Sequence, residues 1–306
     1  MAEVVTLGET MAVLYPPEPV VLDATATLAI DIGGAESNLC IALSRLGHRA
    51  RFVSQVGDDP FGARIRATLE REGVDTTFLA THPNAATGVF FREWLPDGAR
   101  RVYYYRRESA ASRMSPEALT AEMFAGAKIL HLSGITPALS ATCAAAAARA
   151  IELAKAAGAL VSFDPNYRGR LWSPEQAQKA LLPLMRQADI LLLGHEDAAA
   201  VLGTHGDDAT LAAAGELGPS TVVLKLAERG AVAIVDGKRT AVPAVLVNQV
   251  VDPVGAGDGF NAGFLAGLLR GTSTEQALEL GAMVGAACVA TLGDYAGYPR
   301  EPQPAG

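Results

Sequence analysis

The stretch Asp252-Pro-Val-Gly-Ala-Gly-Asp-Gly-Phe260 is the most informative part of this chain. Residues 255–257 are small, and the apolar segment after them, through Leu268, predicts a helix that begins among the glycines. Glycine lets backbone N–H groups approach a ligand closely because it has no Cβ atom. A helix N-terminus adds unpaired N–H groups and the positive end of the helix dipole. The stretch therefore predicts a site for an anion such as a phosphate group.

Asp258 lies in the first turn of that predicted helix. Its carboxylate could cap the helix, or it could accept a proton from a hydroxyl group that attacks a phosphate. The residues alone leave both roles open. Other phosphate-binding motifs are absent from the sequence: it has no P-loop, and Phe260 stands where a dinucleotide-binding fingerprint requires glycine.

Short apolar runs alternate with longer segments of helical periodicity over most of the chain, which predicts a mostly parallel sheet between two layers of helices. Strands are expected at 4–7, 51–56, 129–132, 160–163, 190–193, 222–225 and 231–235. Helices are expected at 35–46, 61–72, 141–157, 174–186, 208–217, 257–269 and 274–291.

Two segments depart from this pattern. Residues 11–30 contain three prolines, and residues 86–108 contain two aromatic-rich runs around Pro96-Asp97-Gly98, a sequence typical of a hairpin turn. We expect these two segments to form a small β-sheet lid, within a single domain that spans residues 1–306.

The composition excludes several classes of protein. The 306 residues include 25 Lys and Arg against 33 Asp and Glu, a formal net charge of −8, so nucleic-acid binding by bulk charge is not expected. Half of the residues are hydrophobic, which excludes a disordered chain. Three widely spaced cysteines suggest neither a disulfide framework nor a zinc site. No apolar run reaches the length of a membrane span, and we expect a cytoplasmic protein.

The chain resembles the PfkB, or ribokinase-like, family of carbohydrate kinases over roughly residues 4 to 295. The resemblance rests on the stretch 252–258 and on a second motif, Gly33-Gly34-Ala35-Glu36-Ser37-Asn38. Within the family it is most similar to 2-keto-3-deoxygluconate kinases, on three further segments: Tyr103-Tyr-Tyr-Arg106, His131-Leu-Ser-Gly-Ile-Thr-Pro137 and Asp164-Pro-Asn-Tyr-Arg168.

This resemblance implies a three-layer ribokinase-like α/β/α fold and ATP-dependent phosphorylation of the 6-hydroxyl of 2-keto-3-deoxygluconate. Asp258 would be the general base. Residues of the anion hole would be Gly255, Ala256 and Gly257. Residues near the sugar would be Gly34, Asn38, Phe90, Tyr104, Arg106, Arg168 and Asp294. Residues near the nucleotide would be Asn166, Lys225, Gly230 and Gly257. Mg²⁺ is expected with ATP, with Asp164 and Asp197 as candidate ligands, and a monovalent cation such as K⁺ is left open.

Arg106 and Arg168 favour an acid sugar, because arginine binds a carboxylate through two parallel hydrogen bonds. Side chains of a strand alternate between its faces, so Tyr104 and Arg106 are expected on the sugar side and Tyr103 and Tyr105 on the other. The outward tyrosines predict a homo-oligomer, either a dimer formed through the lid or a higher assembly.

The sequence departs from the family at three places, and at one of them Gly259 stands where alanine is frequent. Gly194-His-Glu-Asp197 stands where relatives have an N-x-x-E motif, and Leu226-Ala227 stands where they have glycine. Three alternatives stay open at this point. The protein could be a fructokinase or another sugar kinase of the same fold, or a non-catalytic sugar or nucleotide sensor. An RNA-binding module, suggested by the arginines and tyrosines of 100–107, is disfavoured by the net charge of −8.

Overall fold

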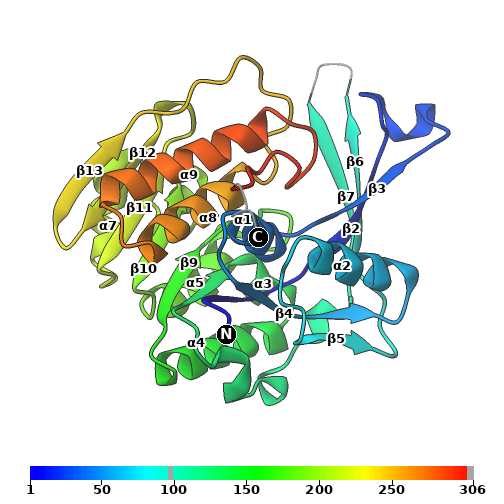
Figure 1. Ribbon diagram of the computed structural model, residues 1–306, viewed down its shortest axis with the longest axis horizontal. Coiled ribbons are helices and arrows are strands. Elements are labelled where there is room, and N and C mark those ends of the chain that lie inside the picture. The colour runs from blue at the N-terminus through cyan, green and yellow to red at the C-terminus, as the bar shows by residue number, and fades with distance from the viewer. Residues whose placement is uncertain (96–98, 302–306) are drawn as a thin grey trace.

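The computed structural model describes residues 1–95 and 99–301 (Figure 1). Its main sheet has the strand order β13-β12-β11-β10-β9-β8-β1-β4-β5. Neighbours from β11 to β5 are parallel, whereas β12 and β13 are antiparallel additions at one edge. The strands are β1 (Val4–Leu7), β4 (Ala50–Gly57), β5 (Leu79–His82), β8 (Ile129–Ser133), β9 (Leu160–Asp164), β10 (Ile190–Gly194), β11 (Thr221–Lys225), β12 (Ala231–Val235) and β13 (Lys238–Val242). The predicted mostly parallel sheet is confirmed.

Helices cover both faces of this sheet because its strands are apolar on both sides. Leu191 and Leu193 of β10 belong to one buried cluster, and Ile190 and Leu192 belong to the other. The first cluster includes residues of α4 (Ala141–Ala156), α5 (Pro174–Met185), α6 (His195–Leu202) and α7 (Asp207–Gly215). The second includes residues of α1 (Ala35–Arg45), α2 (Pro60–Arg71), α8 (Ala256–Leu269) and α9 (Thr274–Val289). The three-layer prediction is therefore confirmed.

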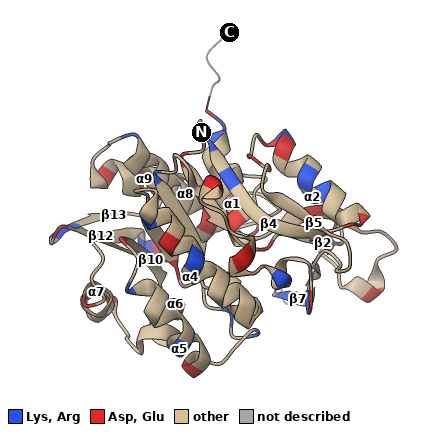
Figure 2. Cartoon of the chain, turned by 90° about the horizontal axis from the view of Figure 1, so that it is seen from below, with Lys and Arg blue, Asp and Glu red and all other residues tan. Residues whose placement is uncertain are grey.

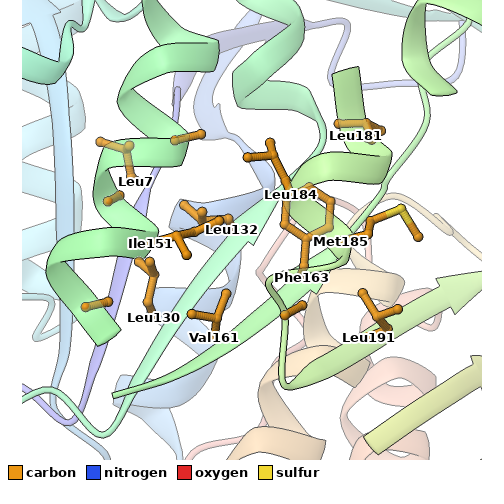
Figure 3. Packing of buried hydrophobic residues seen from close by; sticks show 14 of the residues in the cluster. Leu7, Leu130, Leu132, Ile151, Val161, Phe163, Leu181, Leu184, Met185 and Leu191 are labelled. Atoms are coloured by element: carbon orange, nitrogen blue, oxygen red, sulfur yellow. The ribbon is translucent and has the colours of Figure 1, made fainter. Parts of the chain in front are cut away.

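Figure 3 shows the first cluster from close by. Leu132 of β8 is drawn next to Ile151 of α4, and Phe163 of β9 next to Leu184 of α5; all four belong to the same buried cluster. Parallel strands of this kind end at a common edge, and β9, β10 and β11 end there at Asp164, Gly194 and Lys225. The core therefore brings these three residues to one side of the molecule.

A separate four-stranded sheet, which we call the small sheet, projects beside the main one (Figure 1). Its order is β3-β2-β6-β7, with β2 (Met11–Tyr15), β3 (Ala29–Gly33), β6 (Val89–Trp94) and β7 (Arg100–Tyr105). β6 and β7 pair in antiparallel fashion from Val89↔Tyr105 to Trp94↔Arg100, which is the predicted hairpin. The turn expected at Pro96-Asp97-Gly98 lies outside the described residues.

Two strands and two α-helices were not predicted: β5, β13, α6 and the short helix α3 (Ile135–Leu139). β5 and β13 carry few apolar residues because they are the two edges of the main sheet. The 3₁₀ helices are η1 (Leu22–Ala24), η2 (Ala111–Arg113), η3 (Pro116–Ala118), η4 (Ala121–Phe124) and η5 (Ala227–Arg229). Ends of the predicted helices differ from the observed ones by one or two residues.

Charged residues of both signs are interspersed over the view in Figure 2, which shows no continuous basic face. Among the described residues, no helix is long and apolar enough to cross a membrane. Cys40, Cys143 and Cys288 are buried free thiols.

Candidate active site

The glycine stretch forms a tight loop at the start of α8. Gly255 has φ +84°, a conformation that favours glycine, and an added Cβ would lie 1.8 Å from the carbonyl oxygen of Asp294. The hydroxyl of Tyr298 donates a hydrogen bond to the Gly255 carbonyl at 2.6 Å. Only glycine therefore fits at position 255, and the C-terminal segment binds the backbone of the loop through Tyr298.

Asp258 lies in the first turn of α8, as predicted, but it does not cap that helix. Gly255 is the N-cap residue and receives no side-chain hydrogen bond. Instead, Oδ2 of Asp258 accepts a hydrogen bond of 2.9 Å from Nδ2 of Asn38. Burial raises the pKa of Asp258 to about 7, although the Asn38 hydrogen bond and the positive charge of Arg168 act in the opposite direction. Such a pKa suits a general base at neutral pH.

Asn38 reaches Asp258 because α1 begins close to the glycine loop. An added Cβ at Gly34 would lie 2.3 Å from the carbonyl oxygen of Glu9, and one at Gly33 would lie 2.2 Å from Oδ2 of Asp294. Both glycines are therefore required by close packing. The motifs at residues 33–38 and 252–258 are far apart in the sequence but contact each other in the structure.

Lys225 contributes a positive charge beside the loop. Its Nζ lies 2.6 Å from Oδ2 of Asp164 and 3.2 Å from Oδ1 of Asn261. A Cβ added to Gly257 would lie only 3.9 Å from that Nζ. An ammonium group in this position can stabilise negative charge that develops at the loop.

The candidate metal ligands already have protein partners. Asp164 accepts hydrogen bonds from Lys225 and Asn261, and its Oδ1 accepts the N–H of Asn166 at 3.0 Å. Asp197 accepts the N–H of Gly194 at 2.9 Å, at the start of α6, and burial raises its pKa. Within residues 1–95 and 99–301, no cluster of three or more His, Cys, Asp or Glu side chains could hold a metal. This arrangement fits a Mg²⁺ ion that is carried mostly by phosphates and water, as Mg²⁺ commonly is.

Three residues on the expected nucleotide side have positive φ angles. Gly230 has φ +96°, and an added Cβ would lie 2.1 Å from the Val242 carbonyl oxygen, so both its backbone conformation and its packing require glycine. Asn166 has φ +40°, which asparagine tolerates. Ala227, in the segment where the family resemblance leads us to expect glycine, has φ +51°. Ala227 thus adopts a backbone conformation that favours glycine.

Aromatic residues of the small sheet form the expected sugar side. Phe90 and Tyr104 are directly paired across β6 and β7, with ring centroids 5.6 Å apart. The Arg106 guanidinium lies 5.6 Å from the centroid of the Tyr104 ring. Its Nε donates to Oε2 of Glu9 at 2.7 Å. Glu9 was missed by the sequence analysis, although it directly follows the carboxyl end of β1, where ligands of parallel sheets often bind.

Arg168 and Asp294 complete the predicted sugar residues. Arg168 is exposed, and its charge lowers the pKa of Asp258, so it lies near the reacting end of the site. Asp294 is buried next to Gly33. Burial raises the pKa of Asp294 to about 7, against the effect of Arg92, which was also missed by the sequence analysis.

Comparisons with known proteins identify the family of the chain. A model of the pfkB family carbohydrate kinases matches residues 1–301. The 2-dehydro-3-deoxygalactonokinase of Haloferax volcanii is 36% identical over 96% of this chain and 93% of its own length. The 2-dehydro-3-deoxygluconokinase of Bacillus subtilis is 34% identical over 97% of this chain and 92% of its own length. The crystal structure of 2-dehydro-3-deoxygluconokinase from Thermotoga maritima has a TM-score of 0.87 at 30% identity, and the match covers 96% of each chain.

Proposed function

We propose that this chain, which belongs to the pfkB family of carbohydrate kinases, transfers the γ-phosphoryl group of ATP to the 6-hydroxyl of 2-keto-3-deoxygluconate. The observation that carries the proposal is the position of Asp258, which lies in the first turn of α8 with Oδ2 held by Asn38. Two relatives that act on 2-keto-3-deoxy sugar acids match nearly the whole chain and support this substrate class.

Asp258, residues 255–257 and Lys225 each have a proposed role in the phosphoryl transfer. Oδ1 of Asp258 accepts the proton of the 6-hydroxyl while the hydroxyl oxygen forms a bond to the γ-phosphorus. The bond from that phosphorus to the bridging oxygen breaks, and ADP leaves with the electron pair. Backbone N–H groups of residues 255–257 and the Lys225 ammonium stabilise the charge on the transferred group. Mg²⁺ bound to the phosphates would neutralise part of their charge, with Asp164 and Asp197 as the nearby carboxylates.

The acid-sugar assignment depends on the two arginines. Glu9 contacts Nε and NH2 of Arg106, so NH1 has no hydrogen-bond partner among the described residues and could meet a substrate carboxylate. Arg168 is exposed close to Asp258 and could contact the same substrate. A neutral sugar would offer no carboxylate to NH1 of Arg106 or to Arg168. The fructokinase alternative is therefore disfavoured, although plant fructokinases also match this chain.

A substrate panel with direct measurement of ADP tests the proposal. The panel contains 2-keto-3-deoxygluconate, its galactonate epimer, fructose and ribose. We expect the two acid sugars to have the highest kcat/KM. Preference for fructose would assign the alternative function, and binding without turnover of any sugar would indicate a sensor.

Arginine variants test the carboxylate contact. Arg106→Ala and Arg168→Ala should each raise the KM for the acid sugar about 10- to 150-fold, since a hydrogen bond to a charged group contributes roughly 1.5–3 kcal/mol. The KM for ATP should change little. Arg107→Ala is the matched control, because Arg107 is adjacent to Arg106 and exposed. An unchanged sugar KM in both variants would refute the acid-sugar assignment.

A further inference from the structure

A buried guanidinium lies where the small sheet meets the glycine loop. Arg92 of β6 has only 1% of its side chain exposed. Its NH1 lies 2.9 Å from Oδ2 of Asp252 and 3.1 Å from Oδ1 of Asp294. The centroids of the Tyr15 and Trp94 rings lie 5.2 and 5.7 Å from its central carbon. Two carboxylates and two rings therefore fix this side chain in one position.

The two carboxylates that Arg92 contacts flank the glycine loop. Asp252 begins the loop, and its Oδ1 accepts the N–H of Val254 at 3.2 Å. Asp294 lies on the other side, with its carbonyl oxygen packed against Gly255 so closely that a Cβ there would lie 1.8 Å away. The Arg92 guanidinium therefore contacts both of the aspartates that flank the glycine loop, Asp252 and Asp294.

A second arginine of the small sheet contacts the same segment. Arg100 lies opposite Trp94 in the β6–β7 pairing. Its NH2 donates a hydrogen bond to the Val251 carbonyl, and its Nε lies 3.6 Å from Oδ1 of Asp252. Movement of β6 and β7 relative to the main sheet must therefore either move residues 251–252 or break these contacts.

The Asp252 carboxylate is already engaged by two backbone N–H groups and lies beside two arginines. A carboxylate offers about four lone-pair sites. Oδ1 of Asp252 accepts the N–H of Val254, and Oδ2 accepts the N–H of Gly293 at 3.3 Å and pairs with NH1 of Arg92. Nε of Arg100, 3.6 Å from Oδ1, adds positive charge without a hydrogen bond. Two arginines and two aspartates also balance in formal charge. The residues therefore do not fit a monovalent cation bound to Asp252, because the positive charges of Arg92 and Arg100 would repel such an ion.

We propose that Arg92 is a positioning residue that holds the glycine loop from the small sheet and supplies, from within the chain, the positive charge that a monovalent cation would otherwise provide beside that loop. Two consequences follow. Activity does not require K⁺, and binding of the sugar against the small sheet strengthens binding of the nucleotide at the loop. The proposal rests on the role assigned to residues 255–257, and it does not depend on which sugar is phosphorylated.

Wild-type protein tests the first consequence. We would measure kcat in potassium, sodium or tetramethylammonium chloride at equal ionic strength and fixed Mg²⁺, with ADP quantified by chromatography so that no coupling enzyme is involved. The three values should agree within about twofold. Activation by K⁺ of more than about tenfold over tetramethylammonium would overturn the proposal. This arm needs no variant, so it stands even if a substitution at this buried position prevents folding.

A binding cycle tests the second consequence. Calorimetry would give the Kd of a non-hydrolysable ATP analogue with and without saturating sugar, and the ratio of the two values is the coupling. We expect a ratio of at least about fivefold in the wild type and close to one in Arg92→Gln. Arg92→Lys keeps the charge and should restore part of the ratio. A merely structural role would lower the stability of the variant without abolishing the ratio.

Arg107→Gln is the control, because Arg107 is exposed and lies two residues beyond the end of β7, the partner strand of β6. It should keep the wild-type ratio. A wild type without coupling, or an Arg92→Gln variant that keeps both the ratio and the wild-type kcat, would overturn the proposal. If the substrate panel identifies a different sugar, the cycle is run with that sugar, so a wrong substrate assignment is distinguished from a failure of this proposal.

Discussion

Nδ2 of Asn38 lies 2.9 Å from Oδ2 of Asp258, although 220 residues separate the two in sequence. The contact connects the start of α1 to the start of α8. It occupies one carboxylate oxygen and leaves the other without a hydrogen-bond partner among the described residues. A base must be held in one orientation to accept a proton efficiently, and this amide provides that orientation.

Replacement of Asp258 by asparagine should lower kcat by about 10²–10⁴, the usual contribution of a general base. The fold should persist, because Asp258 does not cap α8 and asparagine has nearly the same shape. Direct ADP measurement and circular dichroism check both statements. Asp208→Asn is the control, since Asp208 is 85% exposed and lies on α7. A near-normal kcat in Asp258→Asn would remove this residue from the mechanism.

The pH dependence of activity should follow the same carboxyl group. Because burial raises the pKa of Asp258 to about 7, half of the free enzyme is protonated at that pH. We expect kcat/KM to fall about tenfold per pH unit below pH 7. A profile that stays flat down to pH 5 would show that the base has an ordinary pKa or that another group accepts the proton.

The stability of the protein should also depend on this group. The folded-state pKa of Asp258 is about 7, against an ordinary value of 3.8. Protonation of this group therefore contributes its full amount to the free energy of unfolding only below pH 3.8. That contribution is lost as pH rises through about 7. Asp258→Asn does not titrate, so its Tm relative to wild type should be higher at pH 8 than at pH 5. Equal Tm differences at both pH values would contradict the raised pKa.

Ala227 offers a test of backbone strain. An alanine at φ +51° costs about 1–2 kcal/mol relative to glycine, whereas glycine gains about 0.5–1 kcal/mol of entropy in the unfolded state. Ala227→Gly should therefore stabilise the protein by roughly 0.5–1 kcal/mol, measured by chemical denaturation. Ala212→Gly is the control, because Ala212 is exposed on α7 and glycine is unfavourable inside a helix. This substitution should lower the free energy of unfolding by a similar amount. A destabilised Ala227→Gly variant would contradict the strain argument.

The layers, the hairpin and the glycine loop could be predicted from sequence because each depends on local periodicity or on a few adjacent residues. The helix from Ala256 and the strand ending at Lys225 lie where the sequence predicted them, within one residue. β5 and β13 were missed because edge strands need little apolar character. The role of Asp258 stayed open for a similar reason, since its partner Asn38 lies on another helix.

Two charged contacts of the site could not be predicted. Glu9 meets Arg106 across 97 residues, and Arg92 meets Asp294 across 202. Nothing in the local sequence of β6 distinguishes Arg92, which is fully buried, from Arg101 of β7, whose side chain is 51% exposed. The difference comes from the pairing of four strands, which places alternate residues on opposite faces of the small sheet.

The same pairing leaves an apolar row on the outward face of the small sheet. Ile30, Leu14, Phe91 and Tyr103 are consecutive partners across β3, β2, β6 and β7. Ile30 is 39% exposed, and Tyr105, on the same face, is 68% exposed with its ring packed on Phe91. Isolated apolar residues are common on protein surfaces, whereas a continuous row commonly marks an interface. We expect this row to meet the same row of a second copy about a two-fold axis.

A dimer formed in this way would hold the small sheet over the sugar, because Phe90 and Tyr104 lie on its opposite face. Light scattering should show a dimeric wild type. Ile30→Asp with Tyr105→Asp should give a monomer whose KM for the sugar is raised about tenfold or more, while its Tm falls only slightly. Leu160→Asp is the matched control, since Leu160 is 49% exposed at the start of β9, outside the small sheet, and the variant should remain dimeric. A monomeric wild type, or a monomeric double variant with the wild-type KM, would show that the small sheet positions the sugar without a partner subunit.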